Sequence, residues 1–219
     1  MISGADTHRR GLAAVLPILL TLALLLPLGA PAASAAEPAS AAPAWGLPQL
    51  MQAMAGIKSE RRTFTERKYL KVLTAPLESS GVLVYQAPAH LEKHTLAPRD
   101  ERMVLDQGII EIESRSRHFR RTLMATQYPA VGAFVESMRA TLAGDLNALT
   151  RYYQVQLEGQ ASNWRMQLVP IDAAARDMVR EIRIQGRDAR ITGIEIVESG
   201  GDRMVMAVGD EVGSAGATP

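Results

Sequence analysis

The sequence predicts a curved antiparallel β-sheet with helices packed on one of its faces. About ten short segments alternate apolar with polar residues and are separated by turn residues, which is typical of antiparallel strands. One longer segment repeats its apolar residues at helical spacing instead. A strongly curved sheet encloses volume, which is either filled by side chains as an ordinary core or left as a cavity for an apolar ligand.

The first 36 residues have the three parts of a secretory signal peptide. Two arginines precede an apolar run from Leu12 to Leu28, and Ala33 and Ala35 supply the small residues that cleavage requires. The alternative is an uncleaved membrane anchor, but the run is at the lower end of the spanning length and two prolines interrupt it. We therefore expect an exported protein that resides in the periplasm.

The composition excludes several classes of protein. Without residues 1–36 the chain loses two of its 24 basic and one of its 23 acidic side chains, which leaves 22 of each. A nucleic-acid binder normally carries a basic surplus, so nucleic acid is not an expected partner. The chain has no cysteine, which excludes disulfides, a thiol nucleophile and lipid attachment through cysteine.

The elements of the first half can be placed in order. Residues 37–46 form an Ala/Pro/Ser-rich segment without periodicity, which predicts a disordered leader. A short amphipathic helix follows over residues 47–57, with Pro48 near its start, and Thr63 to Leu73 alternates as a strand. Ser80 to Glu113 predicts a meander whose four strands are Gly81–Gln86, Leu91–Leu96, Glu101–Asp106 and Ile109–Glu113.

The segment Arg115 to Leu123 is dense in cations and has two interpretations. It is either an edge strand whose charges deter aggregation, or a site for an anion or a phospholipid head group. A longer helix then begins near Pro129 and ends at Gly144, and Asp145 caps a further helical turn.

The last third of the chain predicts strands again. Two hairpins are expected, the first around Gly159 and the second around Gly186. The apolar parity switches at Gly193, which predicts a bulge or sharp bend. A last strand carries Met204, Met206 and Val208. The domain thus spans residues 47–209, and residues 210–219 form a frayed, disordered tail.

The sequence offers little for catalysis or metal binding. It contains no G-x-S-x-G elbow, no H-E-x-x-H and no glycine-rich phosphate loop. His90, Glu92 and His94 would share one face of a strand, but the two histidines would then lie about 13 Å apart, whereas one metal ion needs each nitrogen at about 2 Å. We therefore expect no enzyme, no metal and no cofactor; a hydrolase is the least supported alternative.

The order of motifs resembles the LolA-like carriers of outer membrane lipoproteins. The resemblance rests on Phe64 and Glu66 in the first strand, Gly81 to Tyr85 running into Ala87-Pro88, and the Gln107-Gly108 turn. It continues through the helix end at Gly144-Asp145 and the strand Trp164 to Pro170, and so covers nearly all of the mature chain. Well-studied members carry an arginine at the position of Ala87, where it helps to hold a helical lid shut.

This resemblance implies an unclosed antiparallel barrel, or half-barrel, with helices covering an apolar cavity that holds acyl chains. The implied function is a periplasmic carrier of an acylated lipoprotein or glycolipid from the inner to the outer membrane. The implied partners are this cargo, an inner-membrane release complex or exporter, and an outer-membrane acceptor. The alternative is a lipid-sensing regulator of a signalling protein. Candidate residues for the apolar cavity are Phe64, Leu83, Val84, Tyr85, Leu105, Phe134, Met138, Trp164, Met166 and Leu168.

Overall fold

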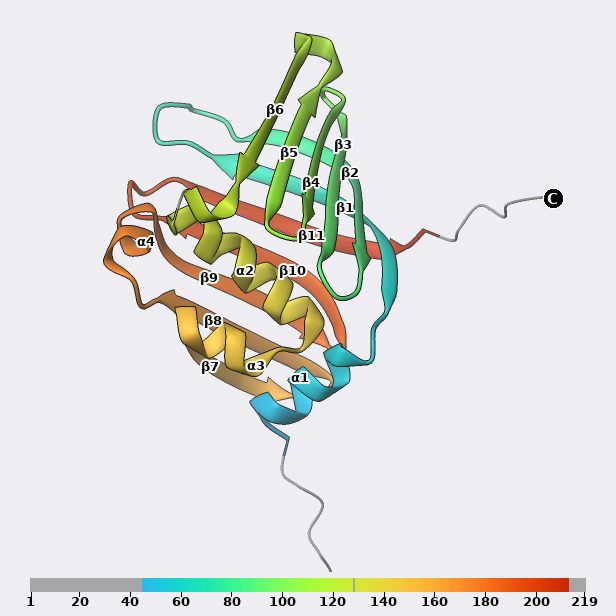
Figure 1. Cartoon of the computed structure of the whole chain (residues 1–219), viewed down its shortest axis with the longest axis vertical. Coiled ribbons are helices and arrows are strands. Elements are labelled where there is room, and N and C mark those ends of the chain that lie inside the picture. The colour runs from blue at the N-terminus through green and yellow to red at the C-terminus, as the bar shows by residue number, and fades with distance from the viewer. Residues whose placement is uncertain (1–44, 128, 213–219) are drawn as a thin grey trace, which may run out of the picture. The chain divides into compact units, whose positions relative to one another are not determined.

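Eleven antiparallel strands form one sheet in the order β6-β5-β4-β3-β2-β1-β11-β10-β9-β8-β7 (Figure 1). The computed structural model describes residues 45–127 and 129–212, all within one compact unit, and side chains of the longest helix from Val135 onward. Within this part of the chain the edge strands β6 and β7 do not pair with each other, so the barrel is not closed. The predicted fold class, an unclosed antiparallel sheet with a few helices, is confirmed.

The first wing of the sheet consists of the strands β6 to β1 in the order above. Successive hairpins build it, because each strand from β1 to β5 pairs with the one that follows it in sequence. Its elements are α1 (Leu47–Ala55), β1 (Ser59–Tyr69), β2 (Leu77–Gln86), β3 (His90–Ala97), β4 (Glu101–Asp106), β5 (Ile109–Ser114), the 3₁₀ turn η1 (Arg115–Arg117), β6 (Phe119–Met124) and the 3₁₀ turn η2 (Ala125–Gln127).

The second wing consists of β11 to β7 and joins the first wing through the pairing of β1 with β11. The last strand of the chain therefore lies at the centre of the sheet, beside the first strand. The remaining elements are α2 (Pro129–Ala143), α3 (Leu146–Tyr152), β7 (Tyr153–Gln160), β8 (Asn163–Pro170), α4 (Ala173–Met178), β9 (Val179–Arg187), β10 (Arg190–Glu198) and β11 (Arg203–Glu211).

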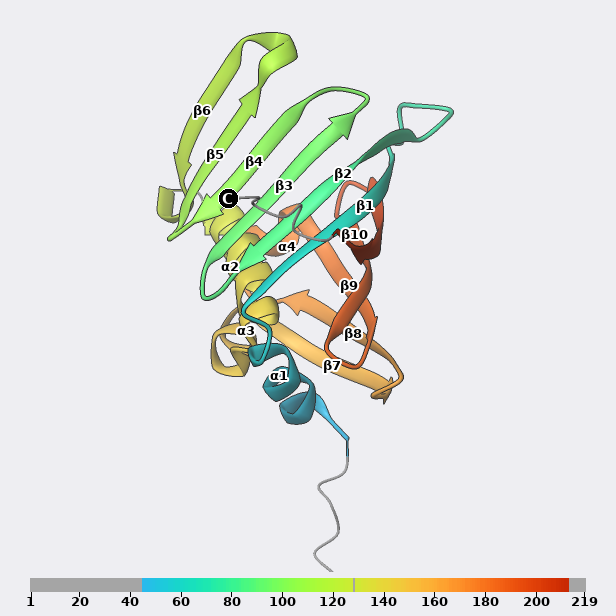
Figure 2. The same ribbon diagram turned by 90° about the vertical axis from the view of Figure 1, so that its right-hand side faces the viewer.

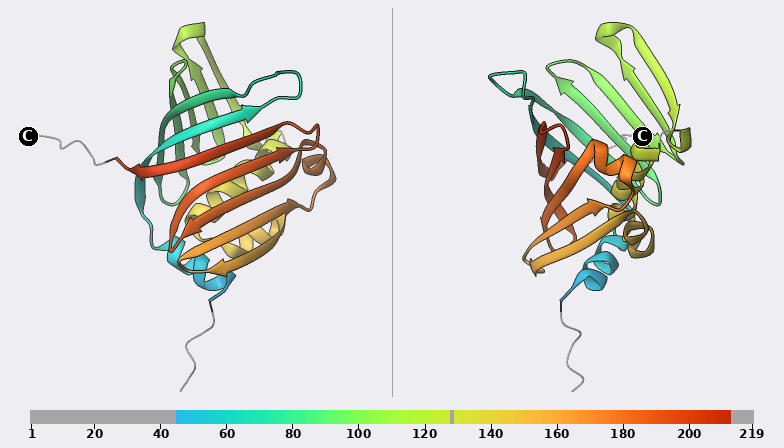
Figure 3. Two further views of the ribbon diagram at one scale, coloured as in Figure 1. Left: turned by 180° about the vertical axis from the view of Figure 1, so that it is seen from behind. Right: turned by 90° about the vertical axis from the view of Figure 1, so that its left-hand side faces the viewer.

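Helix α2 lies on the face of the sheet that we call the inner face, between the two wings (Figure 2). It packs against α1, α3 and α4. Seen from behind, the second wing has no helix in front of it, so its helices are all on one side (Figure 3). No helix in the described residues is long and apolar enough to cross a membrane.

Two hydrophobic clusters hold the helices on the sheet. The larger cluster joins α1, α2 and α3 to β7–β11 and to Phe64 of β1, with Leu50, Met54, Leu149 and Ile182 fully buried. The smaller cluster joins β4, β5 and η2 through Leu105, Ile110 and Ala125, with Val135 of α2 packed against it. Helix α2 thus contacts both wings.

Several predicted features are present as expected. Helix α1 buries Leu50, Met51 and Met54 along one side, and the helix before Gly144 is α2. The register of β10 against β9 shifts between Ile191 and Gly193, which confirms the bulge. Gly144 has φ +67°, and a Cβ there would lie 2.1 Å from the carbonyl oxygen of Met51, so only glycine allows α1 this close to the end of α2.

Other expectations need correction. β1 begins at Ser59 and ends at Tyr69, four residues before the predicted strand at each end, because the charges that suggested a helix stop lie on the strand itself. Helix α4 was missed, although Asp172 accepts a hydrogen bond from Ala175 N–H as its N-cap. Trp45 packs against the larger cluster and so is not part of a disordered leader, and β11 continues past residue 209 to Glu211. The predicted signal peptide lies outside the described residues.

Candidate functional site

A cavity of about 240 Å³ lies between α2, the inner face of β1–β5 and the neighbouring strands β10 and β11. It lies where the two hydrophobic clusters adjoin, so both wings contribute to its walls. Of its twenty lining residues only Glu60, Arg62, Glu66 and Lys93 are charged. The others are Leu83, Val84, Tyr85, Leu91, Met103, Leu105, Ile110, Val135, Met138, Leu142, Ile191, Ile194, Ile196, Met204, Met206 and Val208.

Strand register explains why these apolar residues converge. Directly opposed residues in paired strands point to the same face of a sheet. Tyr85 pairs with Leu91, Leu91 with Leu105 and Leu105 with Ile110, which forms one apolar row across β2–β5. This row lies on the inner face of the sheet, the face on which α2 packs. Alternating sequence patterns in four separate strands therefore add up to one wall.

The structure places the predicted site residues in two different environments. Leu83, Val84, Tyr85, Leu105 and Met138 line the cavity. Phe64, Trp164, Met166 and Leu168 belong to the filled larger cluster, where each is at most 2% exposed. The side chain of Phe134 lies outside the described residues. Whether the five lining residues bind lipid stays a prediction.

The four buried residues share the inner face but lie beneath or beside other side chains. Met166 pairs with Ile184, and Ile184 pairs with Ile194. The first two of these three are fully buried in the larger cluster with α1 and α3, whereas Ile194 lines the cavity. The helices therefore fill one end of this row and leave the other end open.

Most of the cavity lining on the second wing was missed. Ile194 and Ile196 of β10 and Met204, Met206 and Val208 of β11 supply that wall. Their alternation identified the strands and could have pointed to a shared face. The alternation does not show that β11 pairs with β1. This pairing brings the apolar face of β11 close to Leu83 and Tyr85 of β2.

The charged residues of the lining form two ion pairs. Arg62 Nη1 lies 2.8 Å from Glu60 Oε1, and its Nε donates to the carbonyl oxygen of Gly209 at 2.8 Å. Lys93 Nζ lies 2.5 Å from Glu66 Oε2 and 5.1 Å from the centre of the Phe64 ring. All four side chains are largely buried, with at most 23% exposed. The four charged groups therefore pair with one another within an otherwise apolar lining.

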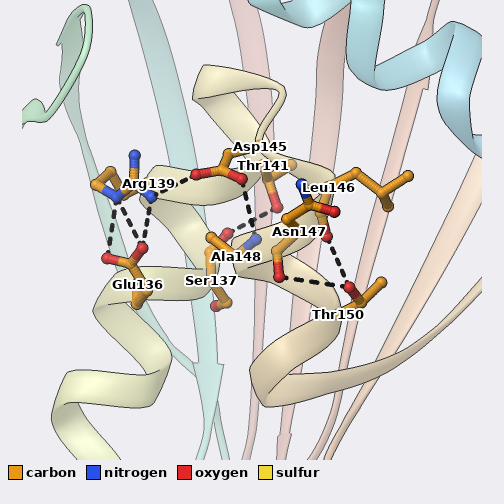
Figure 4. Close-up of polar contacts among 9 residues, drawn as sticks. All are labelled: Glu136, Ser137, Arg139, Thr141, Asp145, Leu146, Asn147, Ala148 and Thr150. Atoms are coloured by element: carbon orange, nitrogen blue, oxygen red, sulfur yellow. Dashed lines mark hydrogen bonds and ion pairs between the residues drawn. The ribbon is translucent and has the colours of Figure 1, made fainter.

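Polar contacts of α2 lead to α3 and to the second wing. Arg139 donates to Glu136 within α2 and to Asp145, the N-cap of α3, at 3.1 Å (Figure 4). These contacts raise the pKa of Arg139. Burial raises the pKa of Tyr153 at the start of β7, and its hydrogen bond with Ser137 of α2 offsets only part of this rise. Toward β2–β5, α2 presents the apolar side chains Val135, Met138 and Leu142 at the cavity.

His90 and His94 form contacts with acidic residues outside the cavity lining. His94 Nε2 lies 2.9 Å from Asp100 Oδ1, and His90 Nδ1 lies 3.4 Å from Asp106 Oδ2. No group of three or more metal-ligating side chains occurs in the described part of the chain.

Three arginines of the cationic segment pair with acidic neighbours: Arg117 with Glu101 at 2.7 Å, Arg115 with Asp100 at 3.8 Å and Arg120 with Glu113 at 3.6 Å. Because β6 is an edge of the sheet, these contacts favour the edge-strand interpretation over an anion site.

Comparison with known proteins gives one family match. The model of the family described as outer membrane lipoprotein carrier protein LolA-like matches residues 35–218. A search of curated proteins found no match.

Several solved structures are similar to the chain at low identity. A LolA superfamily protein of Nitrosomonas europaea is 11% identical with a TM-score of 0.43, covering 77% of this chain and 93% of that one. A domain attributed to outer membrane lipoprotein sorting in Vibrio parahaemolyticus is 9% identical with a TM-score of 0.45, covering 78% and 92%. LprF from Mycobacterium bovis is 11% identical with a TM-score of 0.33, covering 79% and 96%.

Proposed function

This chain belongs to the family of LolA-like outer membrane lipoprotein carrier proteins, and we propose that it is a periplasmic carrier that shields acyl chains during transfer from the inner to the outer membrane. The cargo is an acylated lipoprotein or glycolipid. The role is binding and release without catalysis. The signal peptide expected in residues 1–36 delivers the protein to the periplasm.

The observation that carries this proposal is the apolar cavity. Its volume is about 240 Å³, and sixteen of its twenty lining residues are uncharged and mainly apolar. An acyl chain in this space would be removed from water, which contributes about 25 cal/mol for each Å² of apolar surface that is buried. The volume also exceeds the cavity of about 150 Å³ that binds benzene in an engineered protein.

The contacts of α2 support an entry route. Its polar contacts run to Asp145 of α3 and to Tyr153 of β7, so they tie α2 to the second wing. The side chains that α2 contributes to the cavity, Val135, Met138 and Leu142, are apolar. Contacts of this kind separate without leaving buried charges unpaired. We propose that the cavity opens along the seam between α2 and β2–β5.

The energetics of cargo transfer require partners on both membranes. Each methylene moved from lipid into water costs about 0.8 kcal/mol, so one 16-carbon chain costs about 12 kcal/mol. A multiply acylated cargo therefore does not leave a membrane for water spontaneously, because its chains add their transfer free energies. We propose that a release complex or exporter in the inner membrane loads the cavity and that an acceptor at the outer membrane, with a more favourable apolar site, removes the cargo.

The test is to identify what the cavity holds and whether filling it prevents binding. Native mass spectrometry of the protein purified from its own periplasm is expected to show a bound acyl lipid. Met204→Trp fills the cavity wall of β11 and should abolish this bound species. Ala207→Trp is the matched control, because Ala207 is exposed on the same strand; it should retain the lipid.

Two results would contradict the carrier. Wild-type protein without any acyl ligand, or equal ligand loss in both tryptophan variants, would remove the cavity as the site of cargo. Crosslinking of the lipid-loaded protein in cells then identifies its partners. Recovery of a signalling protein in place of membrane transport components would favour the lipid-sensing alternative.

A further inference from the structure

Tyr85, which lines the cavity, carries a buried hydroxyl group that has no hydrogen-bond partner in the described part of the chain. Tyr85 is 4% exposed and lines the cavity from β2. Its hydroxyl oxygen has no partner among the described residues. Among the described residues, Nε1 of Trp45 is also buried without a hydrogen-bond partner. Trp45 packs against the larger cluster and does not line the cavity. Buried hydroxyl groups normally have partners, so this exception requires an explanation.

The other polar groups of the cavity do not supply that partner. Glu60 pairs with Arg62, and Glu66 pairs with Lys93. The two residues that oppose Tyr85 in the neighbouring strands are Glu60, already paired, and Leu91, which is apolar. The remaining lining residues are aliphatic or methionine. The described side chains of the cavity lining therefore leave this hydroxyl group available to a ligand.

The protonation state of Tyr85 makes its hydroxyl group a hydrogen-bond donor. Burial raises the pKa of its hydroxyl above the ordinary value, and the charge of Arg139 opposes this only in part. The group is thus neutral at physiological pH and can donate its proton in a hydrogen bond. The ligand should bring an acceptor.

We propose that the Tyr85 hydroxyl donates a hydrogen bond to the carbonyl oxygen of an ester-linked acyl chain, so that the cavity selects acyl esters over plain hydrocarbon. This inference rests on the proposed carrier function. An ester carbonyl accepts without donating and so pairs with one donor. An amide linkage would also bring an N–H, and the carboxylates on the cavity wall are already held by Arg62 and Lys93. Ester linkages are therefore the better match.

The test compares ligands of equal length in wild type and Tyr85→Phe. Methyl dodecanoate carries an ester carbonyl, N-methyl dodecanamide carries an amide, and tetradecane carries neither. Each displaces the fluorescent probe N-phenyl-1-naphthylamine, whose own dissociation constant is measured for each variant. Removing a single hydrogen bond to a buried carbonyl is expected to weaken methyl dodecanoate by about tenfold. Tetradecane should bind both proteins equally, and the amide should bind wild type more weakly than the ester.

A spectroscopic readout makes the test independent of affinity. With a carbon-13 label at the carbonyl, the infrared band of bound methyl dodecanoate should lie at lower frequency in wild type than in Tyr85→Phe. The variant should be at least as stable as wild type, since it removes an unpaired buried hydroxyl. If the variant does not fold, the band of the wild-type complex decides by itself, because an unshifted band overturns the inference.

The remaining outcomes separate the two proposals. If none of the three ligands displaces the probe from wild type, the carrier function fails. If all bind but Tyr85→Phe weakens the ester and tetradecane alike, or if the amide binds wild type as tightly as the ester, the carrier function stands and the selection of esters by Tyr85 is overturned.

Discussion

Trp164 of β8 lies directly across Gly186 of β9, so closely that a Cβ on Gly186 would come within 2.3 Å of the ring atom Cζ2. The ring is also fixed by its Nε1, which donates to the carbonyl oxygen of Asp188 at 2.8 Å. The indole therefore fills the space that a side chain at position 186 would need. This contact makes Trp164 a core residue and separates it from the cavity.

We predict that Gly186→Ala destabilises the protein by about 2 kcal/mol or more, because the added methyl group overpacks a region closed by the Trp164 ring and by backbone. A Cβ there would also lie 2.3 Å from the carbonyl oxygen of Arg190. Denaturant unfolding measures the effect. Gly200→Ala is the control, since nothing lies within 4 Å of its Cβ position; a Gly186→Ala protein as stable as this control would refute the packing argument.

The ion pair between Lys93 and Glu66 gives a second prediction. Lys93→Met leaves the Glu66 carboxylate largely buried beside apolar side chains, and should cost about 2 kcal/mol, less than a fully buried pair because some solvent reaches it. Adding Glu66→Gln should restore much of this loss. Arg67→Met, which breaks the exposed pair with Glu78, should have a much smaller effect on stability, because solvent screens this pair. If Lys93→Met and Arg67→Met lowered the free energy of unfolding equally, burial of the Lys93–Glu66 pair would not be the cause of the loss.

The N-cap of α3 predicts a pH-dependent contribution to stability. The pKa of Asp145 is lowered by the hydrogen bond from Ala148 N–H and by Arg139. Because its pKa is lower in the folded state, the carboxylate stabilises the fold above its unfolded pKa of about 3.9, and the contribution is lost as pH falls through the folded value.

We therefore expect Asp145→Asn to be less stable than wild type at pH 7 by about 0.5 kcal/mol, since the site is partly exposed. Urea unfolding from pH 7 to pH 2 should show the two proteins converging below about pH 4. A difference that stays constant down to pH 2 would mean that the charge of Asp145 is not involved.

The opening of the seam between α2 and β2–β5 can be followed by thiol labelling, because the chain has no cysteine of its own. Leu105→Cys places a thiol on the cavity wall, where the native residue is 4% exposed. It should react slowly with a thiol reagent, at a rate limited by opening, and still more slowly with methyl dodecanoate bound. Ile109→Cys, at a position that is 43% exposed, should react rapidly and at the same rate with or without ligand. Fast labelling of Leu105→Cys that ligand does not slow would contradict a closed cavity.

Local patterns determined which segments are strands and helices. The alternation in Gly81–Gln86 and the helical spacing before Gly144 depend only on neighbours a few residues away, so they are visible in sequence. The bulge at Gly193 was predictable for the same reason, since a change of parity is a local event. The start of β1 was not, because Glu60 and Arg62 suggest solvent exposure until their ion pair is known.

The cavity itself was decided by the tertiary structure. Met166 and Met206 have the same alternating pattern in their strands and lie in one row across the sheet, joined through Ile184 and Ile194. Met166 is fully buried in the cluster that includes α1 and α3, whereas Met206 faces the cavity. Sequence alternation determines the face of the sheet on which a side chain lies. Whether that place is filled depends on helices and strands distant in sequence, whose positions follow from the packing of the whole sheet.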